Sequence, residues 1–303
     1  MKILILGAQG FIGSHLIQFF CEQKQEVYGC DLIDFNTNEF TYTKLSILDS
    51  AFELFISNNT FDVCINASGN GNVSFSFEDP IYDFNANVVA VDTILYLLSK
   101  YQPTCKFVHF SSAAVYGNPL LLPVSEESVL QPQSPYGYHK LLSEIICKKY
   151  FNLYAMPIVI LRPFSVYGNR LKKQIIWDVC SKMNKKNIIE MFGTGNESRD
   201  FIHISDVISI IDLLITHSDF KAEILNIGNG EEVKIKDLAA LLTTHFKNKE
   251  IVFSNTIRVG DPLNWKADIT KISRYGYTMK TPLLEGVRMY VDWFKKETNI
   301  YDK

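Results

Sequence analysis

The stretch Lys2-Ile-Leu-Ile-Leu-Gly7-Ala-Gln-Gly10-Phe-Ile-Gly13 decides the fold of this chain. After Lys2 it begins with a short apolar run, which is typical of a strand buried on both faces of a parallel sheet. Three glycines spaced three residues apart follow, and they open a helix-like segment at residues 11–21. Residues without a Cβ let the backbone bend sharply and let a helix N-terminus approach a pyrophosphate. The stretch therefore predicts a strand-to-helix turn that binds a dinucleotide.

The first half of the chain repeats this alternation of apolar strands and helices. Further strands are predicted at residues 26–30, 62–66, 106–110 and 158–161, with long helices at about 82–100 and from 136 onward. Apolar strands separated by helices indicate a Rossmann-like, doubly wound parallel sheet in an α/β fold. Beyond residue 162 the elements become shorter and more separated. We therefore predict a dinucleotide-binding domain at residues 1–162 and a smaller, mixed α/β substrate-binding region at residues 163–303, interleaved with the first.

Length, charge and composition exclude several classes of protein. The 303 residues are 47% apolar, with 30 Lys and Arg against 33 Asp and Glu and a mean hydropathy of +0.02. A net charge of −3 provides no basic surface field for a nucleic acid. No apolar run reaches the roughly 20 residues that cross a bilayer, and we expect no signal peptide, so the predicted location is cytoplasmic. The six cysteines form no C-x-x-C pair and the histidines show no zinc spacing, so no metal site is expected.

Asp31 bears on the choice of cofactor. It ends the second predicted strand, 18 residues after Gly13. An acid at this position accepts hydrogen bonds from both hydroxyls of an adenosine ribose. Leu32 and Ile33 follow it, and no adjacent Arg or Lys is present to hold a 2′-phosphate. The sequence therefore favours NAD(H) as the cofactor but does not exclude NADP(H).

Tyr136 and Lys140 form a candidate acid–base pair. They lie four residues apart on a predicted helix, so both side chains project from one face and the ammonium favours the phenolate. Such a tyrosine can exchange a proton with a sugar hydroxyl or ketone. The spacing alone is weak evidence, because Tyr96 and Lys100 share it. We interpret this second pair as structural, since it lies in an apolar run and its lysine falls near the helix end.

Ser111 and Ser112 follow the predicted strand at residues 106–110 directly. That position places their hydroxyls at the carboxyl edge of a parallel sheet, where ligands bind in open α/β folds. Ser112 is then placed to hydrogen-bond the reacting oxygen. A simple strand-end cap is the alternative for either serine.

Taken in order, these motifs resemble the extended short-chain dehydrogenase/reductase family, the NAD-dependent sugar-nucleotide epimerases, dehydratases and reductases. The motifs that carry the resemblance are the three glycines, Ser112 with Val115-Tyr-Gly, Tyr136/Lys140, Leu161-Arg-Pro-Phe, the stretch Gly193-Thr-Gly-Asn-Glu-Ser-Arg199-Asp-Phe-Ile-His-Ile-Ser-Asp206, and Arg258-Val-Gly-Asp261. The resemblance implies that Tyr136 is the catalytic acid/base and Ser112 its hydrogen-bonding companion. It also implies that Lys140 binds the nicotinamide ribose and tunes Tyr136.

The resemblance further implies which residues bind the cofactor and the substrate. The expected cofactor ligands are Gly7, Gly10, Phe11, Ile12, Gly13, Asp31, Asp49, Tyr136, Lys140 and Arg162. The expected ligands of a nucleotide sugar are Ser112, Ser165, Arg199, Arg258 and Asp261. Arginine suits a diphosphate because its guanidinium offers charged donors in a fork. A homodimer through paired helices near residues 82–100 and 136–154 is implied as well.

Departures from the family pattern reduce the number of reactions that the chain is expected to catalyse. Ala113 and Ala114 stand where the dehydratases carry an Asp-Glu pair, so no acid and base are present there to eliminate water. Ser165 stands where the galactose-type epimerases usually place an asparagine. Ser46 replaces the usual aspartate near the adenine, with Asp49 nearby. The segment 66–72 is rich in Gly and Asn and is predicted to be a flexible loop beside the nicotinamide.

We therefore predict an oxidoreductase that acts at C4 of a nucleotide-linked hexose, in the first place a reductase of a 4-keto-6-deoxy sugar. The alternative is a 4-epimerase that uses the same residues in both directions with tightly held NAD⁺. The compact substrate region and the absent dehydratase acids favour reduction, whereas Asp31 favours epimerisation. A non-catalytic dinucleotide sensor is a third hypothesis, but it has no reason to retain Ser112, Tyr136 and Lys140 as a set.

Overall fold

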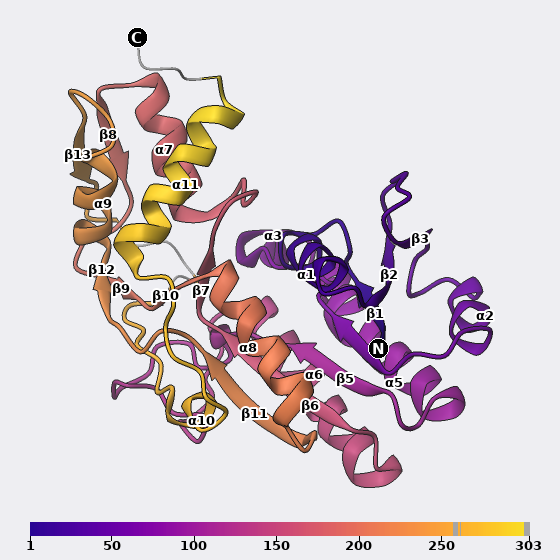
Figure 1. Ribbon diagram of the computed structural model, residues 1–303. Helices are drawn as coiled ribbons and strands as arrows, with labels where there is room; N and C mark the ends of the chain where they lie inside the picture. The colour runs from indigo at the N-terminus through magenta and orange to yellow at the C-terminus, as the bar shows by residue number, and fades with distance from the viewer. Residues whose placement is uncertain (257–259, 261, 300–303) are drawn as a thin grey trace. The chain divides into compact units, whose positions relative to one another are not determined.

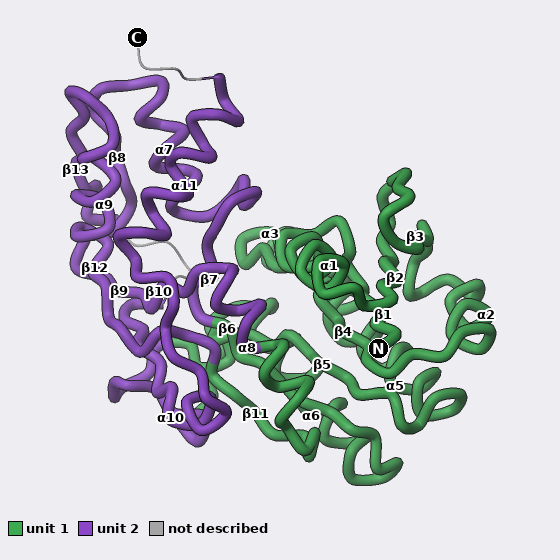
Figure 2. The backbone as a smooth tube through the Cα atoms, viewed as in Figure 1, with its two compact units in different colours: residues 1–117, 129–163, 211–226 green, residues 118–128, 164–210, 227–303 purple. Residues whose placement is uncertain are grey.

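The computed structural model describes residues 1–256, 260 and 262–299 (Figure 1). The chain divides into two compact units, shown in different colours in Figure 2. Unit 1 contains residues 1–117, 129–163 and 211–226, and unit 2 contains residues 118–128, 164–210 and 227–303. Each unit therefore includes a segment from the far side of the predicted boundary at residue 162.

A seven-stranded sheet forms the centre of unit 1, in the order β11-β6-β5-β4-β1-β2-β3. Its strands are β1 (Lys2–Leu6), β2 (Glu26–Asp31), β3 (Thr41–Lys44), β4 (Val63–Asn66), β5 (Lys106–Phe110), β6 (Ile158–Pro163) and β11 (Lys221–Ile227). The pairs from β3 through β6 are parallel. The strand order reverses between β1 and β4, which is where open α/β sheets bind ligands at the carboxyl edge. The predicted doubly wound parallel sheet is confirmed.

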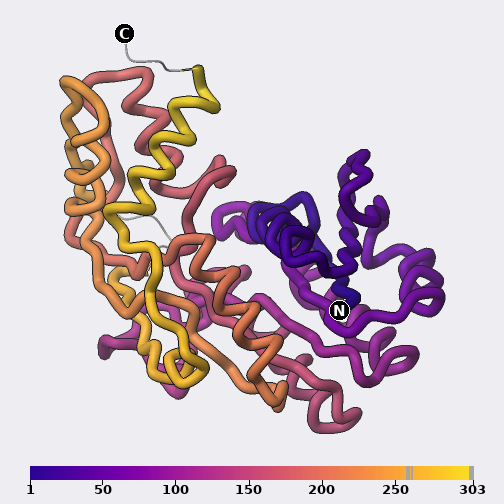
Figure 3. The backbone as a smooth tube through the Cα atoms, viewed as in Figure 1, coloured from indigo at the N-terminus to yellow at the C-terminus, as the bar shows by residue number. Residues whose placement is uncertain are grey.

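The last strand of this sheet comes from far along the sequence. In Figure 3 the orange trace of residues 221–227 runs beside β6, which belongs to a much earlier part of the chain. The amide of Ile158 donates to the carbonyl of Phe220 at 2.9 Å, at the point where this pairing starts. The sheet of unit 1 is thus completed by a segment that follows residues 164–210 of unit 2.

Helices cover the sheet because each has an apolar stripe to bury. Those of unit 1 are α1 (Phe11–Glu22), α2 (Ala51–Ser57), α3 (Val73–Glu78), α4 (Pro80–Phe84), the π-helical turn η1 (Asn85–Val89), α5 (Ala90–Tyr101), the 3₁₀ turn η2 (Ala113–Val115) and α6 (Pro135–Tyr154). Side chains of α2, α5 and α6 join those of β1, β4, β5 and β6 in one core. Ser134 caps α6 by accepting the amide of Gly137 at 3.1 Å, and Pro135 occupies its first turn.

Residues 80–101 form a helical stretch that, by length and composition alone, is long and apolar enough to cross a membrane. Half of that stretch is buried inside the structure. Val91, Ile94, Leu95 and Leu98 pack in the core of unit 1. These contacts identify it as a core helix of that unit.

Unit 2 is a smaller mixture of short strands and helices. Its elements are β7 (Ser165–Tyr167), α7 (Gln174–Lys185), β8 (Ile188–Met191), β9 (Ser198–Arg199), β10 (Phe201–His203), the start of α8 (Ile204–His217), β12 (Val233–Lys234), α9 (Ile235–Thr243), β13 (Glu250–Phe253), α10 (Thr270–Ser273) and α11 (Leu283–Glu297). The pairs β7–β10 and β8–β13 are parallel, and β9–β12 is antiparallel. The buried carboxylate of Asp200 joins its segments by accepting the amides of Asn229, Gly230 and Ala267. Burial raises the pKa of Asp200 to about 6.

Candidate active site

The glycine-rich turn lies between the end of β1 and the start of α1. Gly7 has a φ of +78°, and a Cβ there would lie 2.6 Å from the carbonyl oxygen of Ala67. A Cβ on Gly13 would lie only 2.1 Å from the carbonyl oxygen of Gly7. Within the described residues, no side chain caps the N-terminus of α1 and no acid lies in its first turn. The amides of that turn are therefore available to an anion, and the cradle fits a pyrophosphate.

Asp31 lies beside this turn. Its Oδ2 accepts the amide of Gln9 at 2.8 Å, and its Oδ1 accepts the amide of Leu32 at 2.7 Å. These bonds fix the carboxylate, and each oxygen keeps a lone pair for a ribose hydroxyl. Asp49 instead accepts the amide of Ala51 at 2.8 Å in the turn before α2. Both remain predicted cofactor ligands.

Ser112, Tyr136 and Lys140 come together in unit 1. The Oγ of Ser112 accepts the amide of Ala114 at 3.1 Å, and the Ser112 side chain lowers the pKa of Tyr136. Lys140 Nζ donates to the carbonyl oxygen of Phe110, the last residue of β5, at 3.0 Å. The same Nζ lies 5.8 Å from the centroid of the Tyr136 ring. The strand-end cap named as the alternative for Ser112 is present, and its role as the hydroxyl companion of Tyr136 stays a prediction.

Burial shifts the two proton carriers in opposite directions. Tyr136 is 9% exposed and Lys140 is 5% exposed. Burial raises the pKa of Tyr136 to about 12, and the Ser112 side chain partly offsets this rise. Burial lowers the pKa of Lys140 to about 8. Adjacent titratable groups whose surroundings separate their pKa values are the arrangement on which acid–base catalysis relies.

The second pair with the same spacing has a different environment. Tyr96 is 51% exposed on α5, and Lys100 Nζ pairs with Glu53 at 2.9 Å near the helix end. These contacts match a structural pair at the surface. Sequence spacing thus finds the candidates, and burial separates them.

Arg162 is not placed as a cofactor ligand. It is 1% exposed, and its Nε and Nη2 donate to the two carboxylate oxygens of Glu144 at 2.8 and 2.7 Å. Its Nη1 donates to the Tyr116 hydroxyl at 2.8 Å. A guanidinium engaged in this way inside unit 1 argues against the predicted cofactor contact. The ion pair ties β6 to α6 instead.

Besides Ser112 in unit 1, two of the predicted substrate ligands, Ser165 and Arg199, lie in described parts of unit 2. Ser165 lies in β7, where its amide donates to the carbonyl of Asp200 at 2.9 Å. Arg199 Nη1 donates to the carbonyl oxygen of Ser198 at 2.8 Å, and its guanidinium lies 5.8 Å from the Trp265 ring centroid. Arg258 and Asp261 lie outside the described residues. These four stay predictions.

The sequence analysis missed a buried polar cluster beside Tyr136. Asn70, in the segment predicted to be a flexible loop, donates to the buried carboxylate of Asp83 at 2.6 Å. His139 Nδ1 lies 2.5 Å from the same carboxylate. Asn72, at the end of the loop, caps α3 by accepting the amide of Phe75 at 3.2 Å. The loop predicted to be flexible is therefore hydrogen-bonded to neighbouring segments at Asn70 and at Asn72. No sequence signal singles out Asp83, because the same stretch 80–101 contains a second acid, Asp92, whose side chain is 47% exposed.

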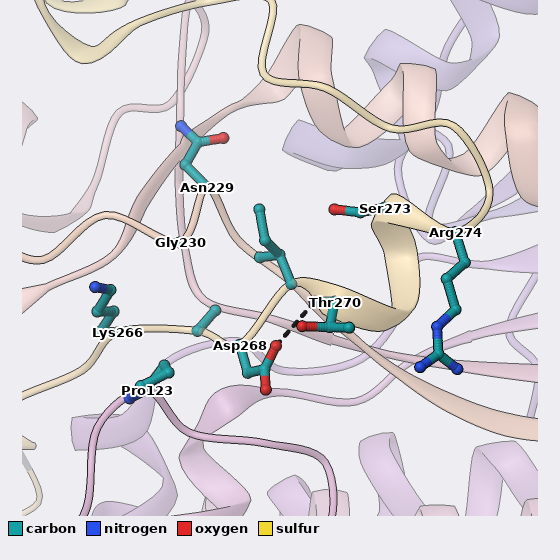
Figure 4. Close-up of a pocket in the computed structure, with 10 residues that line it drawn as sticks. Pro123, Asn229, Gly230, Lys266, Asp268, Thr270, Ser273 and Arg274 are labelled. Carbon is teal, nitrogen blue, oxygen red and sulfur yellow. Dashed lines mark hydrogen bonds between the residues drawn. The ribbon is translucent and has the colours of Figure 1, made fainter.

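A cavity of about 540 Å³ lies in unit 2 (Figure 4). Lys266, Asp268 and Arg274 are the charged residues in its lining, and the Asp268 carboxylate accepts the amide of Thr270 at 2.9 Å. None of the predicted catalytic residues lines it. The cavity is therefore not the site of the predicted chemistry.

Comparison with known proteins identifies the family. Residues 3–228 match the model of the NAD dependent epimerase/dehydratase family. The chain is 32% identical over 302 residues to a Methanocaldococcus jannaschii protein named "Putative UDP-glucose 4-epimerase", covering 97% of this chain and 98% of that one. It also resembles two crystal structures, and in each case the match covers 98% of this chain and 100% of the other chain. They are a Bacillus cereus UDP-glucuronic acid 4-epimerase with UDP-glucuronic acid and NAD (28% identity, TM-score 0.89) and a Thermotoga maritima UDP-glucose 4-epimerase with UDP-glucose (26%, 0.90).

These matches confirm the predicted resemblance and the prediction of an enzyme. They support the epimerase alternative better than the reductase that we placed first, because the relatives are named as 4-epimerases. On the strength of the family model and of a relative that matches end to end, the chain belongs to the NAD dependent epimerase/dehydratase family.

Proposed function

We propose that this protein is an NAD-dependent 4-epimerase of a UDP-linked hexose. The observation that carries the proposal is that buried Tyr136 and Lys140 lie with partly buried Ser112 at the carboxyl end of β5, in the same unit as the glycine cradle. Asp31, which is followed in the sequence by Leu32 and Ile33 and not by an Arg or Lys, favours NAD over NADP. The names of the most similar relatives favour epimerisation over reduction.

In this proposal each side chain of the group has one task. Tyr136 removes the proton from the C4 hydroxyl of the sugar and later returns it to the same oxygen. Ser112 holds that oxygen through its hydroxyl, and the Lys140 ammonium stabilises the phenolate form of Tyr136. Bound NAD, which the glycine cradle and Asp31 would hold, would supply the redox chemistry at C4. The C4 configuration inverts when the sugar presents its opposite face before C4 is reduced again, so no cofactor is consumed overall.

The experiment that tests the proposal separates epimerase from reductase. The purified protein is incubated with UDP-glucose or UDP-glucuronic acid, and with a nucleotide-linked 4-keto-6-deoxy sugar plus NADH or NADPH. We expect the C4 epimer of a UDP-hexose to form, detected by NMR, without net change in reduced cofactor. Stoichiometric loss of NADH with the keto sugar and no C4 epimer would instead establish the reductase.

We also propose that the protein is a homodimer. The neighbouring helical segments α4–α5 and α6 expose large apolar side chains, which are Ile81, Phe84 and Tyr96 on the first and Tyr138, Leu142 and Ile145 on the second. Tyr138, Leu142 and Ile145 follow the four- and three-residue spacing of one helix face. Exposed apolar stripes of this kind mark interaction surfaces, and a second copy would present the same stripes. All six cysteines are free thiols, which supports the cytoplasmic location that we propose.

Replacing Ile145 by aspartate is expected to convert the dimer to a monomer, because each copy would bring a charge into an apolar contact. Light scattering behind size-exclusion chromatography measures the mass. Leu54→Asp is the matched control, since Leu54 is equally exposed and apolar but lies on α2. A wild-type mass of one chain, or an equal effect of both substitutions, would contradict this interface.

A further inference from the structure

Beside the Tyr136–Lys140 pair, the structure buries a carboxylate to which the proposed mechanism gives no task. Asp83, at the end of the first turn of α4, is 0% exposed. Its Oδ1 accepts the side-chain amides of Asn70 and Asn87 at 2.6 and 3.0 Å. Its Oδ2 lies 2.5 Å from His139 Nδ1. Three separate segments thus donate to one carboxylate.

These donors come from the segments that surround the catalytic pair. His139 directly precedes Lys140 on α6. Asn87 lies in the π-helical turn η1, and its amide also donates to the carbonyl oxygen of Asn70 at 3.1 Å. Asn70 belongs to the loop that begins at Ala67, whose carbonyl lies against Gly7. Asp83 therefore joins the catalytic turn of α6 to the loop that borders the glycine turn.

Stability alone is a poor reason to keep this carboxylate. Removing a carboxylate from water is costly, and apolar side chains of similar volume often serve a core as well or better. Irregular helical turns such as η1 are frequent at functional sites. A buried carboxylate with a full set of donors, one of which directly precedes the proposed catalytic Lys140, points to a role in that site.

The charge of Asp83 acts on both members of the pair. Burial is the largest influence on Lys140 and lowers its pKa, and Asp83 is the largest influence that raises it. Glu144 and Cys147, on α6 itself, act in the same direction, and His109 on β5 faces the same ammonium. Burial raises the pKa of Tyr136, and Asp83 raises it further. Neutralising Asp83 therefore lowers both pKa values.

We propose that Asp83 is a positioning residue of the active site, which clamps the Tyr136–Lys140 turn of α6 through His139 and Asn70 and serves as the buried counter-charge of the Lys140 ammonium. The inference rests on the acid–base roles proposed for Tyr136 and Lys140. It adds a residue that acts through them and does not touch the substrate.

The first test follows Lys140 itself, with neither sugar nor cofactor present. Protein labelled with ¹³C at the lysine Cε is titrated by NMR, and the Lys140 signal is assigned with Lys140→Arg. Asp83→Asn preserves the shape of the side chain and removes its charge. We expect the Lys140 midpoint to fall by about one pH unit. His139→Phe removes a donor and leaves the charge, so the midpoint is expected to rise.

Asn70→Ala is the matched control for the clamp, because it removes a donor from another segment and changes no formal charge. Its expected shift is less than a third of that of Asp83→Asn. The pH profile of turnover provides the second readout, in which Asp83→Asn moves both limbs to lower pH. A purely structural role would lower the height of the profile and move neither limb.

The outcomes separate this inference from the proposed function. The role of Asp83 as counter-charge would be overturned if the Lys140 midpoint did not move in either Asp83→Asn or His139→Phe. It would also be overturned if the midpoint moved in the same direction in both variants. An equal shift in Asn70→Ala would overturn it as well. If the Lys140 midpoint shifts in opposite directions in the two variants but no C4 epimer forms in the sugar assay, the counter-charge role of Asp83 is kept and the proposed epimerase function is rejected.

Discussion

Tyr136→Phe is expected to lower kcat by about 10³-fold while the affinity for NAD stays within a few-fold of the wild type. Phenylalanine keeps the ring, which is almost fully buried, and removes only the hydroxyl. The substrate oxygen then has no group that can take or return its proton. C4 epimer formation followed by NMR measures kcat, and calorimetric titration measures NAD binding.

Tyr96→Phe is the matched control for this substitution. Tyr96 has the same spacing from a lysine as Tyr136 but is half-exposed on α5. Removing the Tyr96 hydroxyl is expected to leave kcat within a factor of two of the wild-type value. Turnover of Tyr136→Phe close to that of the control would remove Tyr136 from the mechanism.

Arg162→Met is expected to reduce the free energy of unfolding by about 3–5 kcal/mol, because it leaves the Glu144 carboxylate charged and buried without its partner. Both side chains of the ion pair are 2% exposed, and the N–O distance is 2.7 Å. Ser111 also donates to Glu144 at 2.5 Å, so the affected network reaches the strand end next to Ser112. Urea denaturation followed by circular dichroism measures the loss.

A double substitution tests whether this cost comes from the stranded charge. Glu144→Gln combined with Arg162→Met removes both charges, and we expect it to recover at least half of the lost stability. Lys149 lies on α6 like Glu144, and it forms a half-exposed ion pair with Asp92 of α5. Lys149→Met breaks this pair and should cost less than about 1 kcal/mol of the free energy of unfolding. A loss in Arg162→Met no larger than that of Lys149→Met would show that the buried pair contributes little.

Local patterns predicted the parts of the site whose geometry is itself local. The apolar run of β1 and the glycines after it require a buried parallel strand and a tight turn, and the structure has both. Tyr136 and Lys140 share a helix face by periodicity alone. Ser112 reaches the carboxyl edge because the strand before it ends there. The backbone periods of 2 and 3.6 residues determine these placements, so no distant residue is needed to find them.

The tertiary structure decided which of these candidates are buried and what they face. Tyr96 and Tyr136 have the same spacing to a lysine, and only packing exposes one and encloses the other. Arg162 lies in a family-like motif, yet its role depends on Glu144, which comes from a different element. Asp83 meets His139 across 56 residues of sequence. The sequence alone determined the strands, the turn and the helix faces, because backbone geometry repeats over a few residues. Charge pairing and burial were left to the fold, because they depend on residues that only packing brings together.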